Sequence, residues 1–117
     1  MILFKRPAFF RDLERYSSWI AVDNPEAARR LIDATEKACS LIQKHPEMGS
    51  QEKFRKQHGI RSWRLEGFEN YLIFYRSNVE TVEVLRLLHG ALNLPGNFDV
   101  RIKYSGFSVG IPAYPES

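Results

Sequence analysis

The sequence predicts an α+β domain of two layers, with an N-terminal strand, an antiparallel helical hairpin and a three-strand antiparallel meander. Two consecutive apolar stripes with helical spacing run through residues 8–44. Three strand-like runs joined by short turns follow in residues 60–89, and one short apolar run precedes the helices. A helical hairpin can bury its apolar stripes only against such a sheet, so the helices and the strands form separate layers.

The chain begins with a predicted strand over residues 2–6, which read ILFKR. Pro7 changes the pattern, because proline is well suited to the first turn of a helix. A helix is predicted over residues 8–22, and its apolar stripe consists of Phe9, Leu13, Tyr16 and Ile20. The charged residues between these positions, Asp12 included, are expected to face water.

The second helix has clear signals at both ends. Asn24 is a favourable N-cap, and Pro25 is a favourable first residue. The helix is expected to end at His45, because the residue before Pro46 avoids the helical conformation. Cys39 lies on the apolar stripe of this helix, so we expect a small buried side chain and not a nucleophile.

The second half of the chain is predicted to form the meander. Residues 46–59 read as a loop, and strands are predicted at residues 60–65, 71–76 and 81–89. The last two runs are apolar on both faces, which is typical of a strand covered on two sides, so one or both should lie inside the sheet. Six side chains are predicted to fill the core between the layers: Tyr16, Ile20, Leu31, Ile42, Phe74 and Leu85.

Length and composition limit the class of protein. The 117 residues suffice for one domain, and 44% hydrophobic and 26% charged residues are ordinary for a globular protein. The single cysteine excludes an internal disulfide, no stretch approaches the roughly 18 apolar residues of a membrane span, and the N-terminus has no signal-peptide pattern. A cytoplasmic protein is the simplest expectation. Metal-ligand spacing and a glycine-rich phosphate loop are absent from the sequence, so neither a metal nor a cofactor is expected.

Basic residues are concentrated in the loop and in the first strand of the meander. The formal net charge is +3, yet residues 53–64 hold five basic residues and no acid: Lys53, Arg55, Lys56, Arg61 and Arg64. Such a patch attracts a phosphate backbone or an acidic protein, although a solvated loop has the same composition. Arg76 and Arg86 are further strand arginines that can hold a phosphate or an acidic partner.

His89 ends the last predicted strand, next to Gly90. A histidine at the end of a strand can exchange protons near neutral pH, or it can simply hydrogen-bond to the backbone there. Arg86 lies three residues earlier, so on an ideal strand it points to the opposite face. Only a bulge or a twist would let both residues reach one ligand.

These patterns resemble the RelE/ParE toxin family, and most closely its ParE or plasmid-stabilisation branch. The matching stretches are DLERYSSWIAVDNPEAARRLIDAT, HPEMG, YLIFYR and VEVLRLLHGA, in that order within residues 2–92. The resemblance implies a RelE-like fold for a toxin domain at residues 1–92, followed by a partly irregular C-terminal extension at residues 93–117. It also implies an acidic antitoxin protein that forms a hetero-oligomer with the toxin.

Two activities occur in this family, and they lead to three hypotheses. ParE-like members poison DNA gyrase, which is the leading hypothesis here, whereas RelE-like members cleave messenger RNA on the ribosome. In the ribonuclease hypothesis His89 is the general acid or base, and Arg61, Arg64 and Arg86 stabilise the charge of the transition state. The resemblance implies alanine-arginine-aspartate after the last histidine-glycine, but this chain has Ala91-Leu92-Asn93. A decayed toxin, or a non-toxic basic binding module, is therefore the third hypothesis.

Overall fold

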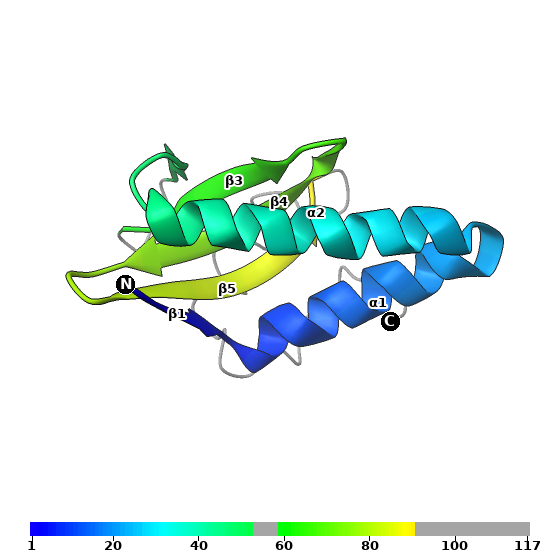
Figure 1. The fold of residues 1–117 in the computed structure, drawn as a ribbon, viewed down its shortest axis with the longest axis horizontal. Coiled ribbons are helices and arrows are strands. Elements are labelled where there is room, and N and C mark those ends of the chain that lie inside the picture. Colours follow the sequence, from blue (N-terminus) through cyan, green and yellow to red (C-terminus); the bar gives the residue numbers. More distant parts are fainter. Residues whose placement is uncertain (53–58, 91–117) are drawn as a thin grey trace.

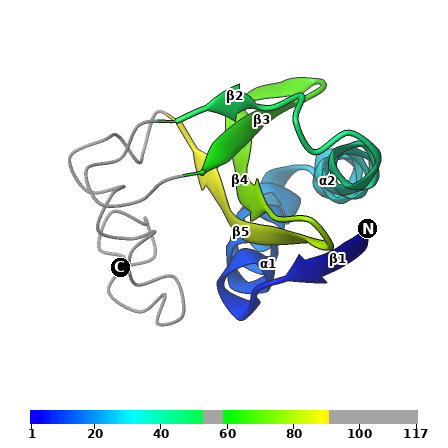
Figure 2. The same ribbon diagram turned by 90° about the vertical axis from the view of Figure 1, so that its left-hand side faces the viewer.

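The fold is known from a computed structural model, which describes residues 1–52 and 59–90. Its elements are β1 (Ile2–Lys5), α1 (Pro7–Asp23), α2 (Pro25–Lys44), β2 (Ser50–Gln51), β3 (Arg61–Leu65), β4 (Phe68–Ser77) and β5 (Thr81–His89). The two helices lie next to each other along the sheet (Figure 1), and the turned view places both on the same side of it (Figure 2). The predicted α+β architecture of two layers is confirmed. The predicted domain boundary at residue 92 lies outside the described residues and stays a prediction.

The helical hairpin follows the signals in the sequence closely. Asn24 caps α2, because its side-chain oxygen accepts a hydrogen bond of 3.0 Å from the backbone N–H of Ala27. Pro25 is the first helical residue, and His45 is the C-cap before Pro46. The link between the helices is shorter than expected, since α1 continues through Asp23 and leaves only Asn24 between the two helices.

The five strands lie in the order β1-β5-β4-β3-β2. The meander β3-β4-β5 is antiparallel, as predicted, and its last two strands lie inside the sheet. β1 pairs with β5 in parallel, from Ile2 opposite Thr81 to Lys5 opposite Val84. The two-residue strand β2 was predicted as loop, and two residues are too few to carry a period that sequence analysis can detect.

A β-bulge lies in the middle of β5. Phe74 is opposite Arg86 while Tyr75 is opposite Val84, so Leu85 is an extra residue without a partner on β4. Side chains that alternate along β4 therefore meet a shifted set on β5. The bulge explains why β5 does not show one regular apolar period, since Val84 and Leu85 are both fully buried.

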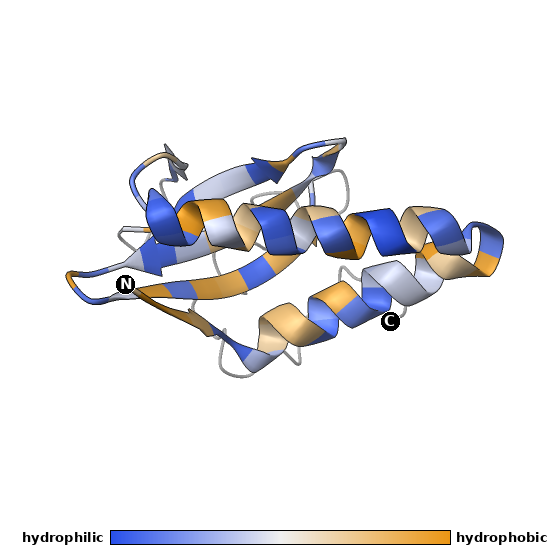
Figure 3. Cartoon of the chain, in the orientation of Figure 1, coloured by the Kyte–Doolittle hydropathy of each residue, from blue (hydrophilic) through white to orange (hydrophobic). Residues whose placement is uncertain are grey.

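The core lies between the helical layer and the sheet. Tyr16, Leu31, Ile42 and Leu85 are 0% exposed and Phe74 is 5% exposed, which confirms five of the six predicted core residues. The sixth, Ile20, is only partly buried against this cluster. In Figure 3 the strands β1 and β5 are largely hydrophobic, whereas hydrophilic and hydrophobic residues alternate along α2.

The core assignment can be tested with a matched pair of helix substitutions. Leu31→Ala should lower the free energy of unfolding by about 2–5 kcal/mol, because it opens a cavity among residues that cannot collapse fully. Ile32→Ala removes a similar side chain from the next position, which is 38% exposed, and should cost much less. Urea denaturation of both variants measures the difference. Equal costs would contradict the assignment of Leu31 to the core.

Candidate functional site

One edge of β5 is closed by α1 and not by a strand. β1 pairs with β5 only as far as Val84, so the later N–H groups on that side have no strand partner. The backbone N–H of Leu87 instead donates to the Asp12 carboxylate at 3.0 Å, and that of His89 donates to the Tyr16 hydroxyl at 3.1 Å. The spacings match, since four helical residues advance about 6 Å and two strand residues about 6.6 Å.

The same carboxylate holds the side chain of Arg86. The Nε and Nη2 atoms of Arg86 donate to the two oxygens of Asp12 at 2.7 and 2.8 Å, a bidentate pair. Arg86 is 0% exposed and Asp12 is 1% exposed. The expectation that Asp12 faces water is therefore wrong, because this carboxylate neutralises a buried charge and accepts a backbone hydrogen bond. Arg86 takes a structural role in place of the expected contact with a target or a phosphate.

His89 lies at the end of β5, in an aromatic environment. Its ring contacts the Tyr71 ring edge-on, with 4.8 Å between the ring centroids. The Tyr71 ring contacts the Tyr16 ring in the same way, with 5.1 Å between the centroids. Burial lowers the pKa of His89 and raises the pKa of Tyr71, because desolvation disfavours the charged form of each group. The neutral form of His89 is thus favoured in the folded protein.

Arg61 anchors the loop that follows α2. Its Nη1 atom donates to the carbonyl oxygens of Glu47 and Gly49 at 3.1 and 2.8 Å. The Tyr75 hydroxyl accepts from the Gly49 N–H at 2.9 Å and donates to the Pro46 carbonyl at 2.8 Å. A Cβ atom at Gly49 would lie 2.4 Å from that hydroxyl, so the HPEMG segment needs glycine at this position.

Arg61, Arg86 and His89, three of the four residues of the ribonuclease hypothesis, do not come together. Arg61 is opposite Tyr75 on β4, and His89 is opposite Tyr71, four residues away along the same strand. That separation is about 13 Å. Arg86 pairs with Asp12 below the surface. Arg86 is opposite Phe74 and His89 is opposite Tyr71, and these two β4 residues point to different faces of the sheet. The bulge at Leu85 therefore does not turn Arg86 toward His89.

A groove of about 590 Å³ lies between α2 and the turn that joins β3 to β4. Its apolar lining includes Ala34, Leu41, Trp63 and Phe68, and its charged rim includes Arg30, Asp33, Lys37, Arg64 and Glu66. β2 pairs only with Arg61 and Ser62, so from Trp63 onward no strand among residues 1–52 and 59–90 covers the edge of β3 beside the groove. An apolar groove beside an open strand edge is a surface that a protein segment can fill.

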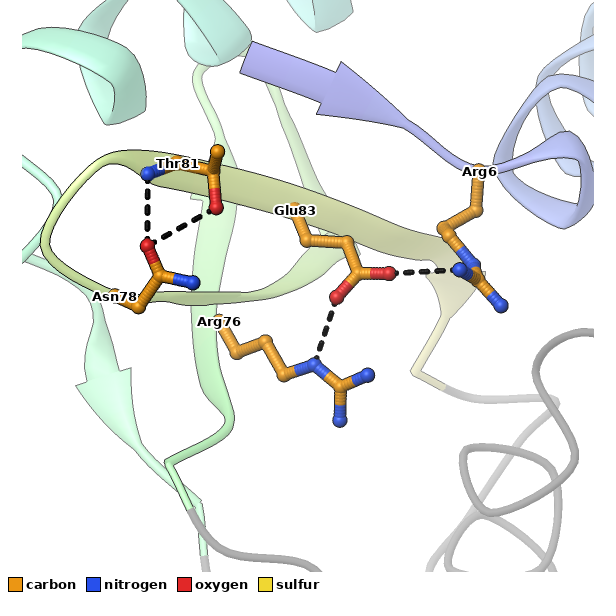
Figure 4. Close-up of polar contacts among 5 residues, drawn as sticks. All are labelled: Arg6, Arg76, Asn78, Thr81 and Glu83. Atoms are coloured by element: carbon orange, nitrogen blue, oxygen red, sulfur yellow. Dashed lines mark hydrogen bonds and ion pairs between the residues drawn. The ribbon is translucent and has the colours of Figure 1, made fainter. Parts of the chain in front are cut away.

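The remaining basic residues lie apart from each other. Arg64 is exposed and donates a hydrogen bond to the Glu69 carbonyl. Arg76 forms an ion pair with Glu83, which also binds Arg6 (Figure 4). Lys53, Arg55 and Lys56 lie outside the described residues, so the continuous patch from residue 53 to residue 64 stays a prediction.

Other kinds of chemistry find little support in the described part of the chain. Residues 1–52 and 59–90 contain no group of three His, Cys, Asp or Glu side chains placed to hold a metal ion. Burial raises the pKa of the Cys39 thiol to about 11, so this cysteine is a packed apolar side chain, as expected. No helix in these ranges has the length and hydrophobicity that crossing a membrane requires.

Sequence reasoning missed three residues that organise these surfaces: Asp12, Tyr16 as a hydrogen-bond acceptor, and Glu83. A signal for Asp12 was present. Arg86 is the only charge in the run VLRLL, and a charge inside a buried strand needs a buried partner. That requirement pointed to a carboxylate on the facing helix, and Asp12 stands one helical turn before the core residue Tyr16.

The fold and the site define a small α+β domain with an apolar groove beside α2, in which Arg61 and Arg86 bind groups of the domain itself. A family model for the ParE toxin of the type II toxin–antitoxin system, parDE, matches residues 3–94. A solved chain of the chromosomal ParDE TA system from P. aeruginosa has a similar fold, with a TM-score of 0.65 and 19% identity over 76% of this chain and 95% of that chain. No curated protein shows a significant match. The chain belongs to the ParE toxin family, which confirms the resemblance noted from the sequence.

The buried ion pair can be tested with an isosteric substitution. Asp12→Asn keeps the shape but removes the charge that balances Arg86, and it should lower the free energy of unfolding by about 3–5 kcal/mol. Glu14→Gln is the matched control, because Glu14 is exposed on the same helix and should change the stability little. Thermal and urea denaturation measure both variants. A stability of Asp12→Asn close to that of the control would contradict the structural role of Arg86.

Proposed function

We propose that this toxin inhibits DNA gyrase by binding to it, and that an acidic antitoxin neutralises the toxin by occupying the groove between α2 and β3. Membership of the ParE toxin family, whose match spans residues 3–94, supports the first part. The separation of Arg61, Arg86 and His89 favours inhibition of gyrase over cleavage of messenger RNA. Proton transfer on RNA needs an acid or base and cations around one phosphate, whereas inhibition by contact does not.

The groove supports the second part of the proposal. Its apolar floor at Trp63, Leu41 and Phe68 can bury apolar side chains of an antitoxin segment, and its rim carries three basic and two acidic residues. Lys37 and Glu66 already form an exposed ion pair across the rim, with a distance of 3.4 Å. Arg30 and Arg64 thus remain as the positive charges that can attract an acidic partner.

The antitoxin site predicts a charge-dependent association. The association rate constant of toxin and antitoxin should fall as ionic strength rises, because salt screens the charges that steer the encounter. Arg30→Glu, on the rim of the groove, should slow association by about tenfold. Arg29→Glu is the matched control, since Arg29 is exposed on the same helix but does not line the groove.

Stopped-flow or surface-based kinetics with the protein encoded by the neighbouring gene measure these rates. Equal slowing by Arg29→Glu and Arg30→Glu would mean that only the total charge matters and that the antitoxin docks elsewhere. A rate unaffected by salt would contradict electrostatic steering altogether.

The mechanism predicts which histidine substitution is tolerated in cells. His89→Gln keeps a hydrogen-bonding side chain but removes the group that titrates near neutral pH. A toxin that acts by contact should still arrest growth on induction and should leave cellular messenger RNA intact. Growth curves and primer extension on abundant transcripts, with and without the adjacent gene, measure the two outcomes.

A ribonuclease that uses His89 as acid or base should instead lose about 10²–10⁴-fold in cleavage rate in this variant. Messenger RNA cut by the parent and spared by a folded His89→Gln protein would replace the gyrase proposal with the ribonuclease. Growth unaffected by either protein would favour the decayed toxin or the non-toxic binding module.

A further inference from the structure

The outer edge of β1 is an unpaired strand edge. In a parallel pair, residues alternate between those that hydrogen-bond the neighbouring strand and those that direct their N–H and C=O away from it. The Ile2 N–H donates to Glu80 at 2.9 Å and the Arg6 N–H donates to Val84 at 3.0 Å, so the intervening groups of Leu3 and Lys5 point outward. β1 is the last strand of the sheet, and no described residue pairs with this edge.

Apolar side chains stand beside this edge, on the face of the sheet away from the helices. Leu3 packs against the core, so the alternate residues Ile2 and Phe4 project from the opposite face. Ile2 is 66% exposed and Phe4 is 50% exposed. Edge strands are usually protected from pairing with another chain by shortness, charge, proline or bulges. β1 is four residues long and ends in Lys5, but its residues 2–4 carry neither a charge nor a proline.

Two guanidinium groups lie at the end of this strand, on the same face. Glu83, opposite Phe4, accepts from Nη1 of Arg6 at 2.9 Å and from Nε of Arg76 at 2.8 Å. Figure 4 shows one carboxylate between two guanidinium groups, with the terminal nitrogens of Arg76 directed away from Glu83. The cluster therefore keeps an excess positive charge, and the buried Nε of Arg6 has no acceptor among the described residues.

The start of α1 adds to the positive potential. The helix begins at Pro7, directly after Arg6, and its first turn contains no acidic residue and no side-chain cap. The N-terminal end of a helix carries a partial positive charge, which favours an anion near the start of α1, next to Arg6.

We propose that the outer edge of β1, together with Ile2, Phe4 and the Arg6–Glu83–Arg76 cluster, docks an extended acidic segment of a partner protein. The segment adds as a strand to β1 through the outward groups of Leu3 and Lys5. Its apolar side chains cover Ile2 and Phe4, and a carboxylate binds between Arg6 and Arg76. This surface is formed by β1, β4 and β5, whereas the antitoxin groove is formed by α2, β3 and the turn after β3, so the two sites are separate.

An acidic extended segment fits the strand edge, the apolar pair and the positive cluster of β1 better than other partners do. A nucleic-acid backbone would use the two guanidinium groups but would leave the strand edge and the apolar pair unused. A second copy of the chain would bring Arg6 and the positive N-terminus toward the same groups, because β1 carries Lys5 and no acid. An acidic strand satisfies the backbone edge, the apolar surface and the charge together.

The test uses the isotope-labelled full chain and two short capped peptides, one of alternating valine and glutamate and one of alternating valine and lysine. Amide shifts in the NMR spectrum locate binding. The glutamate peptide should shift the amides of Leu3 and Lys5 in a saturable way, and the lysine peptide should not. Arg76→Gln should weaken binding by about tenfold, since it removes a charge-assisted hydrogen bond. The matched control Arg29→Gln, exposed on α2 and outside both proposed sites, should change it less than about twofold.

A second variant tests the strand pairing itself. Lys5→Pro removes an outward N–H, which an edge strand tolerates because no ladder bond within the sheet is lost. It should abolish the amide shift at Leu3 while the melting temperature stays near that of the parent. If Lys5→Pro fails to fold, the comparison of Arg76→Gln with Arg29→Gln still decides the case. Any of four outcomes would overturn the proposal. These are equal binding of both peptides, absence of shifts at Leu3 and Lys5, displacement of the glutamate peptide from Arg76 by a DNA oligonucleotide, and dimerisation through β1.

Discussion

The buried pair of Asp12 and Arg86 determines how α1 sits against the sheet. Its carboxylate binds the guanidinium of β5 and also the backbone N–H of Leu87, so it replaces a strand where β1 no longer reaches. One helical turn later, the Tyr16 hydroxyl accepts a hydrogen bond from the backbone N–H of His89. Because an uncompensated buried charge is very unfavourable, α1 cannot slide or rotate without losing both contacts. The helical hairpin, and with it the groove on α2, takes its position from this pair.

That constraint also bears on function. The sequence offers several basic residues, but Arg86 is used to hold a helix and Arg61 to hold a loop. Among the described residues, Arg30 and Arg64 lie together at the rim of the groove, whereas the Arg6–Glu83–Arg76 cluster lies at the end of β1, so these two sets of positive groups do not surround one phosphate. Such an arrangement suits recognition of acidic protein surfaces at separate places better than chemistry at a single point.

Local signals predicted most of the fold, because they act within a few residues. Asn24 with Pro25 and His45 with Pro46 mark both ends of α2, and the apolar runs mark the inner strands. Features that depend on distant residues were not predictable: the parallel pairing of β1 with β5, the bulge at Leu85 and the burial of Asp12 all arise from contacts between segments more than 70 residues apart, or from how two strands register. The candidate site was predicted less well for the same reason, since a basic residue looks alike whether it binds a partner or a buried carboxylate.

Inhibition of gyrase by contact is the activity proposed for this ParE family toxin. A supercoiling assay with purified gyrase, ATP and relaxed plasmid tests it most directly. If the toxin inhibits gyrase by contact, it should stop supercoiling in proportion to its concentration. His89→Gln should do the same, and the antitoxin should restore activity. Full supercoiling at toxin concentrations that arrest growth, with ribosome-bound messenger RNA cleaved by the same preparation, would contradict it.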